Sequence, residues 1–577
     1  MATPVRFGTE FLINTNTRLD QDESAITGLA DGRFIVTWTD DSAIAGDTSE
    51  SAIRAQIYNA DGSQAGPEFV LNSTTLGTQR QPAITELADG RFVASWVDYG
   101  TIGLIRAQVF NANGAKSGAE ILVSNTTGGA QVHTDITGLA SGRFVVTWTD
   151  PNADTGRSET YSQVFNVNGN KVGTAQFVHQ TLGNHYSSAV TALTDGRYVV
   201  TWTDTDTLGK TEVKARIFDA GGSPAGNEFI VNTRLPDDQD EPDIAALKGG
   251  RFVAVWVDNF EGNNEIRAQL FNATGAKSGL EIVVNTTGAG FQVDPAITSL
   301  ADGRFVVTWT DNSNTGGDTS GFSAIRGQLF DADGSPSGAE FLVNTTTTNI
   351  QYQPSITSLA DGRFVISWSD FSGTGADTNS GYAVRGQIFD PREKAVNLTG
   401  TSLADQWVGT RFNDKMSGAG RNDLLKGENG ADNLNGGNGN DRLLGGVGAD
   451  LINGGKNNDV LLGGSGADKL IGGLGRDKMS GETGADDFIF TSATFAGTGA
   501  SRDVIADFEH RVDDIDLGGF MAGGEFIGNS AFEDVAGQVR YNKATGILQG
   551  DVNGDGNADF EIGFTNKPVL SAADFIL

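Results

Sequence analysis

The aspartates near the C-terminal end of the chain recur at a constant interval of nine residues. They are Asp414, Asp423, Asp432, Asp441, Asp450, Asp459, Asp468, Asp477 and Asp486. A glycine stands five residues before each aspartate, from Gly409 to Gly481, and an apolar residue stands two residues after it. Glycine-rich turns can expose backbone carbonyl oxygens, and carbonyl and carboxylate oxygens are the ligands that calcium prefers. The spacing therefore predicts a stack of turns that binds several calcium ions.

The apolar positions of this repeat, from Met416 to Phe488, predict one short strand in each repeat with its apolar side chain facing inward. Without a cation, carboxylates stacked turn on turn would repel one another, and a thin apolar stripe cannot offset the loss of chain entropy. Calcium binding and the folding of residues 409–488 are therefore expected to be one event.

The repeat follows the pattern GGxGxDxUx, where U is a large apolar residue, most fully in GGNGNDRLL, GGVGADLIN and GGSGADKLI. Residues 409–488 thereby resemble the RTX repeats of secreted bacterial proteins. The resemblance implies a calcium-bound parallel β-roll, here over residues 392–490. In the best-matched repeats it adds these loop residues to the aspartates as expected ligands: Gly436, Gly439, Asn440, Gly445, Gly448, Gly463 and Gly466. Calcium is expected to bind less well beside the departures from the pattern, which are Arg411, Phe412, Arg421, Glu428, Asn457 and Glu482.

The segment after the repeats extends the resemblance. DVIADFEHRVDDIDLGGF and DVNGDGNADFEIGF resemble the C-terminal region of serralysin-type secreted proteins. The ending Asp574, Phe575, Ile576 and Leu577 resembles the acidic-then-apolar signal that type I ABC exporters recognise. The resemblance implies a small β-rich secretion domain over residues 491–577, export from a Gram-negative bacterium and an extracellular location.

One loop of this tail has the spacing of an EF-hand. Asp551, Asn553, Asp555 and Asp559 take positions one, three, five and nine, but Ile562 stands where the loop needs a bidentate glutamate. A full EF-hand is not expected, and a turn without calcium remains the alternative.

Residues 1–391 contain a second, longer repeat. The string GRFVVTWTD and its variants occur seven times, with tryptophans at Trp38, Trp96, Trp148, Trp202, Trp256, Trp309 and Trp368. Each unit contains four short runs of alternating polarity, which predicts the four-stranded sheet of a propeller blade. The fourth-strand motif is offset by one unit, because it opens the chain as EFLIN and is missing after Phe389.

We therefore expect an all-β fold in which a seven-bladed propeller is closed by the N-terminal strand, since ring closure removes two exposed sheet edges. Tandem sandwich domains are the alternative, disfavoured because each unit has about half the usual length of such a domain. The long connections, such as those after Asp311 and Asp370, lie on the face opposite the tight turns, and a binding surface is expected there. GDTS-like segments at Asp47, Asp318 and Asp377 are either part of such a surface or simple polar turns.

Units three and four break the propeller repeat. They contain His133, Tyr161, His185 and Tyr186, and Tyr161 replaces an arginine that recurs in other units. A histidine and tyrosine near an arginine could abstract a proton from an acidic sugar, which would make these four residues the catalytic group of a lyase. Drift within a repeat is the structural explanation. Residues present in every unit, such as the tryptophans, are expected to be structural.

Composition limits the remaining functions. The net charge of −33 disfavours nucleic acid and anionic membranes as partners and favours cations. Cysteine is absent, and the sequence contains no HExxH zinc motif, no apolar run long enough to span a bilayer and no N-terminal signal peptide. The leading expectation is a secreted calcium-binding protein whose propeller is a binding or adhesion module for a glycan, a cell surface or matrix. The alternatives are an extracellular polysaccharide lyase-like enzyme and a structural component of a matrix or surface layer.

Overall fold

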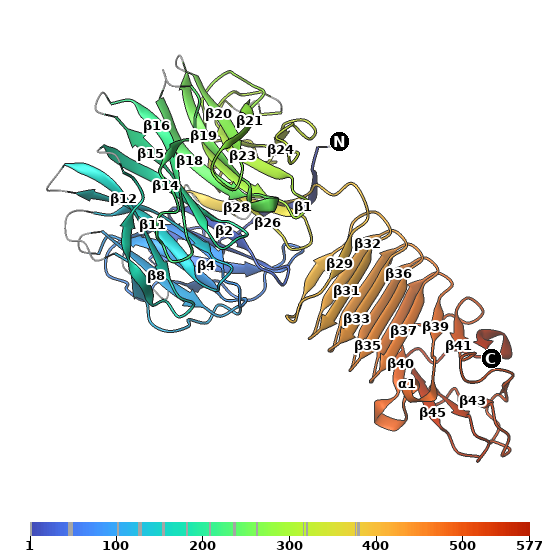
Figure 1. Ribbon diagram of the computed structural model, residues 1–577. Coiled ribbons are helices and arrows are strands. Elements are labelled where there is room, and N and C mark those ends of the chain that lie inside the picture. The colour runs from blue at the N-terminus through green and yellow to red at the C-terminus, as the bar shows by residue number, and fades with distance from the viewer. Residues whose placement is uncertain are drawn as a thin grey trace. The chain divides into compact units, whose positions relative to one another are not determined.

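The computed structural model describes the whole chain except residues 1–2, 44–49, 101–102, 125–129, 153–155, 181–182, 207–208, 235–237, 261–262, 316, 319–320, 375–376 and 378–380. The described residues form strands and turns, with one short α-helix, α1 (Ala493–Ala496), and 3₁₀ turns at Lys248–Gly250, Gly499–Ser501 and Ala572–Asp574. The chain divides into two compact units, Met1–Pro391 and Arg392–Leu577. The expectation of an all-β propeller and β-roll is confirmed (Figure 1).

The first unit is a propeller of seven four-stranded antiparallel sheets, here called blades 1 to 7. Blade 1 is β2–β5 (Gln21–Gly28, Phe34–Asp40, Ala52–Tyr58, Phe69–Val70) and blade 2 is β6–β9 (Gln79–Glu86, Phe92–Asp98, Leu104–Phe110, Ile121–Leu122). Blade 3 is β10–β13 (Val132–Gly138, Phe144–Asn152, Arg157–Phe165, Lys171–Phe177) and blade 4 is β14–β17 (Asn184–Ala192, Tyr198–Thr205, Thr211–Phe218, Phe229–Ile230). Blade 5 is β18–β21 (Asp238–Ala246, Phe252–Phe260, Asn263–Phe271, Lys277–Val283) and blade 6 is β22–β25 (Gln292–Ser299, Phe305–Asp311, Ala324–Phe330, Phe341–Leu342). Blade 7 is β26–β28 (Gln351–Ser358, Phe364–Asp370, Ala383–Asp390) with β1 (Val5–Leu12) as its fourth strand.

The N-terminal strand closes the ring. β1 pairs antiparallel with β28, with Arg6 opposite Phe389 and Leu12 opposite Arg385. The first strands of successive blades contact one another, and β2 of blade 1 contacts β26 of blade 7. The offset of the fourth-strand motif in the sequence thus corresponds to a closure in which the two ends of the propeller chain share one sheet.

Residues repeated in every blade join neighbouring blades. Arg33 of blade 1 donates to the carbonyl oxygen of Ala112 in blade 2 at 3.0 Å, and Arg363 of blade 7 donates to that of Ala60 in blade 1 at 2.6 Å. The conserved spacing of the tryptophans has the same explanation, because Trp38 packs in one buried cluster with residues of blade 7. These contacts make the recurring side chains parts of the scaffold.

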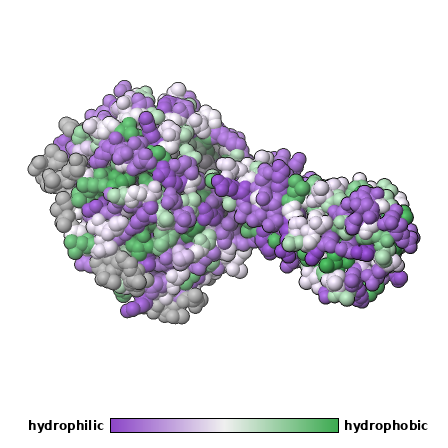
Figure 2. Space-filling view, turned by 90° about the horizontal axis from the view of Figure 1, so that it is seen from below, coloured by the Kyte–Doolittle hydropathy of each residue, from purple (hydrophilic) through white to green (hydrophobic). Residues whose placement is uncertain are grey.

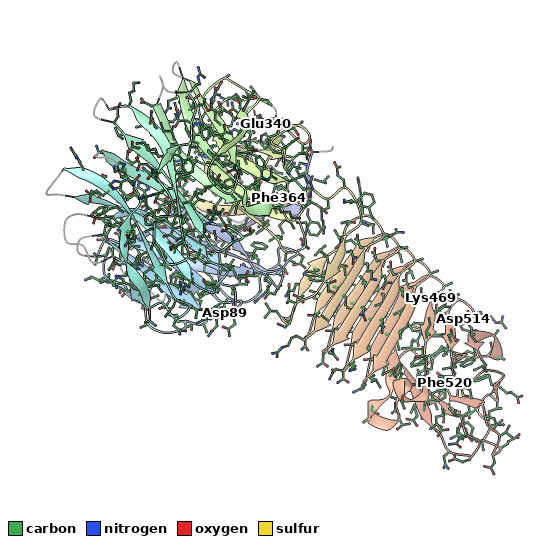
Figure 3. The ribbon with its side chains drawn as sticks, viewed as in Figure 1. Asp89, Glu340, Phe364, Lys469, Asp514 and Phe520 are labelled. Carbon is green, nitrogen blue, oxygen red and sulfur yellow. The ribbon has the colours of Figure 1, made fainter. Side chains whose placement is uncertain are left out.

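A recurring ion-pair triad holds the outer strands of most blades. In blade 6, Arg326 contacts Asp311 at 2.5 Å and Glu340 at 3.1 Å, and Glu340 is labelled in Figure 3. In blade 7 the third member comes from the closing strand, since Arg385 contacts Glu10 at 3.2 Å. The same three positions therefore stabilise both ordinary blades and the closure.

The second unit opens with a β-roll in which successive strands alternate between two parallel sheets. One sheet has the order β29 (Asn397–Thr399), β31 (Lys415–Gly420), β33 (Asn433–Asn438), β35 (Leu451–Lys456), β37 (Lys469–Leu474), β39 (Asp487–Ile489) and β41 (Asp514–Asp516). The other begins with β30 (Gln406–Val408), β32 (Leu424–Asn429), β34 (Arg442–Val447), β36 (Val460–Ser465), β38 (Lys478–Thr483) and β40 (Asp503–Ile505). Residues 18 apart are therefore strand neighbours, as Leu425 and Leu443 are. Lys469 marks the outer side of β37 in Figure 3.

The tail continues both sheets of the roll. β46 (Phe575–Ile576) pairs with β41, and β45 (Phe560–Phe564), β44 (Ile547–Asp551), β43 (Gln538–Asn542) and β42 (Glu525–Phe526) extend the other sheet beyond β40. One apolar core runs from Trp407 to Phe564. The division of this unit near residue 490 stays a prediction.

Figure 2 shows hydrophilic residues spread over the visible surface with small apolar areas between them. Among the described residues, no helix has the length and apolarity that a bilayer crossing requires.

Candidate functional site

The repeated aspartates of the roll form a ladder of hydrogen bonds. Oδ1 of Asp450 accepts the backbone amide of Asp432 at 2.8 Å, and the same bond recurs between aspartates 18 residues apart along the roll. Each of these side chains is almost completely buried. One oxygen of each carboxylate thus accepts a hydrogen bond that joins neighbouring turns.

The second oxygen of these carboxylates is buried and has no hydrogen-bond partner within residues 392–577, every one of which the structure describes. This is true of Oδ2 in Asp423, Asp432, Asp441, Asp450, Asp459, Asp468, Asp477 and Asp503. A buried carboxylate oxygen without a partner is costly unless a cation or a proton compensates it.

Glycine leaves the space that this second oxygen faces. A Cβ atom added to Gly445 would collide with Oδ2 of Asp450 and with the carbonyl oxygen of Gly463, and one added to Gly436 would collide with Oδ2 of Asp441 in the same way. A carboxylate oxygen and a carbonyl oxygen of the next turn therefore converge on one small space. Two hard oxygen donors of this kind fit calcium, so the residues present are compatible with the expected ion.

Electrostatics in the roll favour the same interpretation. Burial, with neighbouring carboxylates adding to it, raises the pKa of Asp423 to about 7 and that of Asp459 to about 8. In Asp503 burial and the nearby Asp477 raise the pKa to about 9. Buried carboxylates repel one another when ionised, and bound divalent cations would remove both the repulsion and the preference for protons.

The predicted loop ligands fall into three groups. Gly436, Gly445 and Gly463 lie beside the aspartate Oδ2 atoms. Gly448 and Gly466 stack closely on the loop one full turn earlier, as Gly439 does on Arg421, so no side chain fits there. The side-chain oxygen of Asn440 accepts the amide of Asn458 at 2.9 Å on the exposed surface of the loop. The assignment of these residues as calcium ligands stays a prediction.

Four departures from the repeat adopt the backbone that its glycines provide. Arg421, Glu428, Asn457 and Glu482 all have positive φ values, between 67° and 87°. This conformation disfavours side-chain-bearing residues by about 1–2 kcal/mol each. The fold of the roll therefore imposes a glycine-like geometry on these positions at a local energetic cost.

Threonine residues donate hydrogen bonds to the carboxylates at the start of the roll. Oδ2 of Asp414 accepts the amide of Thr410 at 2.5 Å, and its Oδ1 accepts the Thr410 hydroxyl at 2.9 Å. Asp405 is held by Thr401 in the same way, with both distances 2.8 Å. The first two turns thus satisfy their carboxylates with protein donors.

Asp405 and Asp503 were missed in the sequence, and both belong to the aspartate ladder. Asp405 lies nine residues before Asp414, with Gly400 five residues before it and Trp407 two residues after it, so an extension of the period would have found it. Asp503 follows an insertion, and its Oδ1 accepts the amide of Asp477 at 2.8 Å. No period in the sequence predicts Asp503, because 26 residues rather than 18 separate it from Asp477.

The EF-hand-like loop of the tail uses its carboxylates on its own backbone. Asp551 accepts the amides of Gly554 and Gly556 at 2.6 and 2.8 Å, and Asp559 accepts that of Val552 at 2.7 Å. These bonds account for the spacing of the acidic residues as a stable turn.

His179 and His185 lie where blade 3 leads into blade 4, at positions that most other blade junctions fill with amide side chains. Where blade 7 leads into blade 1, Asn14 donates to Gln21 at 3.0 Å and Gln21 donates to Asp40 at 3.1 Å. The rings of His179 and His185 stack at 3.8 Å, and Nδ1 of His185 lies 2.6 Å from Asp204. His185 is fully buried, so this pair replaces a structural Asn-Gln pair by another packed pair.

The other predicted catalytic residues lie on separate strands. Tyr161 on β12 stacks on Trp148 at 5.5 Å, in the position of the triad arginine, and its hydroxyl donates to Glu159 at 3.1 Å. Tyr186 on β14 donates to Asp240 at 3.3 Å. His133 lies on β10, where its backbone amide donates to the Gln81 side chain. Each of these three residues occupies a strand position of the repeat and makes a contact within the propeller. Their catalytic role stays a prediction.

Two of the GDTS-like aspartates are interior residues of their loops. Asp318 and Asp377 are almost completely buried, which is typical of turn-stabilising side chains. The third, Asp47, lies outside the described residues.

Comparison with known structures gives matches of low similarity. A protein of unknown function from Dyadobacter fermentans is 12% identical, with 68% of this chain and 99% of that chain covered and a TM-score of 0.41. The α-L-arabinofuranosidase Arb93A of Fusarium graminearum is 12% identical, with coverage of 54% and 93% and a TM-score of 0.39. The NanB sialidase of Streptococcus pneumoniae is 10% identical, with coverage of 67% and 71% and a TM-score of 0.38. At these values the likeness says nothing of function.

Among protein families, one model matches this chain, and it matches residues of the roll. The family model of the RTX calcium-binding nonapeptide repeat matches four times, at residues 408–443, 435–470, 444–479 and 453–488. The comparison with curated protein sequences gave no match. The matched range contains all of the aspartate ladder except Asp405 and Asp503, which lie at its two ends. Residues 408–488 are therefore RTX calcium-binding nonapeptide repeats.

Proposed function

We propose that this chain is a secreted protein whose roll folds when calcium binds between its turns. The observation that carries the proposal is the row of buried Oδ2 atoms without partners, six of which, from Asp423 to Asp468, lie beside a glycine carbonyl oxygen. Ligands come from the repeated aspartates and from Gly436, Gly445 and Gly463, with affinities on the order of 0.1–1 mM that suit an extracellular module. Below that calcium concentration the roll is unfolded, because its carboxylates repel one another.

A calcium titration of the full chain tests this proposal. Far-ultraviolet circular dichroism should show additional β signal as calcium rises from a chelated starting point, and isothermal titration calorimetry should show several bound ions. Magnesium at the same concentrations is the control, since its smaller octahedral coordination shell suits these sites poorly. An ordered roll in the presence of excess chelator at neutral pH would contradict the proposal.

Export by a type I system accords with this folding scheme. In the expected signal, Phe575 and Ile576 pair with β41 in the folded protein, and Asp574 is completely buried. Such a segment is accessible to an exporter only while the tail is unfolded, which is the state of the roll at low cytosolic calcium. Replacing Phe575 and Ile576 with serine should abolish export by a co-expressed type I system while leaving expression unchanged; continued export would disprove this route.

The propeller is proposed to be a binding module for a glycan, a cell surface or matrix. Support comes from its closed scaffold, in which recurring side chains are used for contacts within and between blades, and from the long connections gathered on one face. Binding of the fluorescently labelled calcium-loaded chain to an array of neutral and anionic oligosaccharides tests this role. Uniformly absent binding would refute a glycan ligand.

A further inference from the structure

An open pocket of about 590 Å³ lies between blades 6 and 7, on the face of the propeller that carries the long connections. Asp294 of β22 and Tyr352 of β26 line it near the start of each inner strand. Thr310 and Asn312 come from the end of β23 and the connection after it, and Phe322 and Tyr382 come from the segments that lead into β24 and β28. Two adjacent blades therefore contribute to one concave surface.

The aromatic residues around this pocket are departures from the propeller repeat. Tyr352 lies opposite Ser369, at the register position where blade 1 has Asp22 and blade 6 has Val293. Tyr382 precedes β28 where Ser323 precedes β24, and Phe371 follows Asp370 where Asn312 follows Asp311. The scaffold does not need an aromatic side chain at the Tyr352 position, because blades 1 and 6 close without one, although blade 4 has Tyr186 there.

The three rings of blade 7 support one another. Tyr382 meets Tyr352 edge-on, with ring centroids 5.1 Å apart, and Phe371 lies 4.8 Å from Tyr382. Phe322, at the opposite rim, leaves nearly half of its surface exposed, at 47%. Rigid, partly exposed rings present an apolar surface at low entropic cost. The apolar C–H face of a sugar ring is a suitable partner for such a surface.

Polar groups of the same pocket match sugar hydroxyls. Asp294 has φ 52° at the bulge of its strand, and its Oδ2 accepts the Thr310 hydroxyl at 3.0 Å. Asn312 and Asn314 are exposed at the rim and offer both amide donors and carbonyl acceptors. A few fixed polar groups beside an apolar wall are typical of sites for small polar ligands.

Charge in and around the pocket narrows the ligand class. Asp294 is part of the lining, and Asp20 accepts the backbone amide of Tyr382 at 3.0 Å. No lysine or arginine contributes to the lining among the described residues, and the whole chain has a net charge of −33. Carboxylated or sulfated sugars would meet repulsion without a compensating cation. An uncharged sugar avoids this cost.

From this arrangement we propose that the pocket between blades 6 and 7 binds a neutral sugar residue of a glycan, with its ring against Tyr352 and Phe322 and its hydroxyls on Asp294, Asn312 and Asn314. The inference rests on the proposed role of the propeller as a glycan-binding module and assigns that role to one site. It also makes the pocket selective against acidic glycans.

The test compares matched variants of the calcium-loaded full chain on an array of neutral and anionic oligosaccharides. Tyr352→Ala should weaken binding of neutral glycans by about tenfold or more through loss of the aromatic contact, and Asn312→Ala should weaken it as well. The control is Tyr99→Ala, because Tyr99 follows Asp98 in blade 2 as Phe371 follows Asp370 in blade 7 and does not line the pocket. Unchanged melting temperatures establish that the variants are folded, and Tyr352→Phe, which keeps the ring, provides a milder change.

The possible outcomes distinguish a wrong binding site from a wrong function of the propeller. Loss of neutral-glycan binding in Tyr352→Ala with normal binding in Tyr99→Ala supports the proposal. Normal glycan binding in both Tyr352→Ala and Asn312→Ala overturns the pocket but leaves the glycan-binding role of the propeller in place. Selective binding of anionic glycans overturns the ligand class. Absence of binding by the unaltered chain overturns both the pocket and the proposed role.

Discussion

The backbone amide of Asp441 donates to Oδ1 of Asp459 at 2.8 Å, while Oδ2 of the same Asp459 side chain is buried without a partner in the fully described range 392–577. One carboxylate thus joins two turns of the roll through one oxygen and faces a glycine-lined space with the other. Folding and calcium binding depend on the same side chains, which is the physical basis for treating them as a single event.

Two substitutions of Asp450 distinguish the two roles of its carboxylate, which are the hydrogen bond between turns and calcium binding. Asp450→Asn keeps an oxygen that can accept the amide of Asp432 but removes the charge, so the calcium concentration at the folding midpoint should rise by about tenfold, equivalent to about 1.4 kcal/mol. Asp450→Ala removes both uses and should raise it further. Calcium titrations followed by circular dichroism measure both. Equal midpoints for the two variants would show that the hydrogen bond contributes nothing.

A methyl group on Gly445 should block one calcium position. Its Cβ would collide with Oδ2 of Asp450 and the carbonyl oxygen of Gly463, so Gly445→Ala should reduce the number of bound calcium ions and the stability of the roll. Gly420→Ala is the control, because the nearest atom to its Cβ is the carbonyl oxygen of Asn438 at 3.9 Å. Calorimetry counts the ions. Full calcium stoichiometry in Gly445→Ala would place the ions elsewhere.

Acidification should stabilise the roll when calcium is removed. Burial raises the pKa of Asp423 to about 7 and that of Asp459 to about 8, whereas an unfolded aspartate titrates near about 3.9. Between roughly pH 4 and pH 8 the folded calcium-free roll therefore binds more protons than the unfolded chain, and its free energy of unfolding falls as pH rises. Circular dichroism of chelated protein should show more β signal at pH 5 than at pH 8. With saturating calcium the trend should reverse, because protons compete with the ion.

Glu10 should be specifically important for closure of the propeller. It contacts Arg385 at 3.2 Å and accepts the amide of Thr345 at 2.6 Å, and Glu68 makes the equivalent contacts with Arg54 and Thr15 inside the ring. Each change to alanine should destabilise the propeller by about 1–3 kcal/mol. Only Glu10→Ala should increase hydrogen exchange in β1, since only this residue lies on the closing strand. Similar exchange of β1 in both variants would argue against that distinction.

The histidine pair between blades 3 and 4 should be replaceable by the amides found at other blade junctions. The double change His179→Asn with His185→Gln restores the residues found at the equivalent positions, Asn14 and Gln21, where blade 7 leads into blade 1, and should alter the free energy of unfolding by no more than about 1 kcal/mol. Thermal unfolding measures the stability. Any activity on polysaccharides should also survive the change, because the pair is packed in the scaffold; abolished activity would instead support the lyase alternative.

Both repeats were readable from sequence because each is local. The nine-residue period places one carboxylate, one glycine turn and one apolar side chain in every strand of the roll, and Asp405 could have been found by one further step of the same period. The offset EFLIN motif predicted that β1 would complete blade 7. Asp503 could not be predicted, because 26 residues, rather than the 18 of two repeats, separate it from Asp477.

The amino-acid sequence by itself determined the seven blades, their closure and the register of the RTX repeats, since these follow from spacing along the chain. Only the tertiary structure decided that Thr410 donates hydrogen bonds to Asp414, that His179 and His185 stack on each other, and that Asp294 and Tyr352 line one pocket. The physical reason is that such contacts depend on side-chain direction and on how ring closure sets neighbouring blades against each other, and neither is encoded in the spacing of residues.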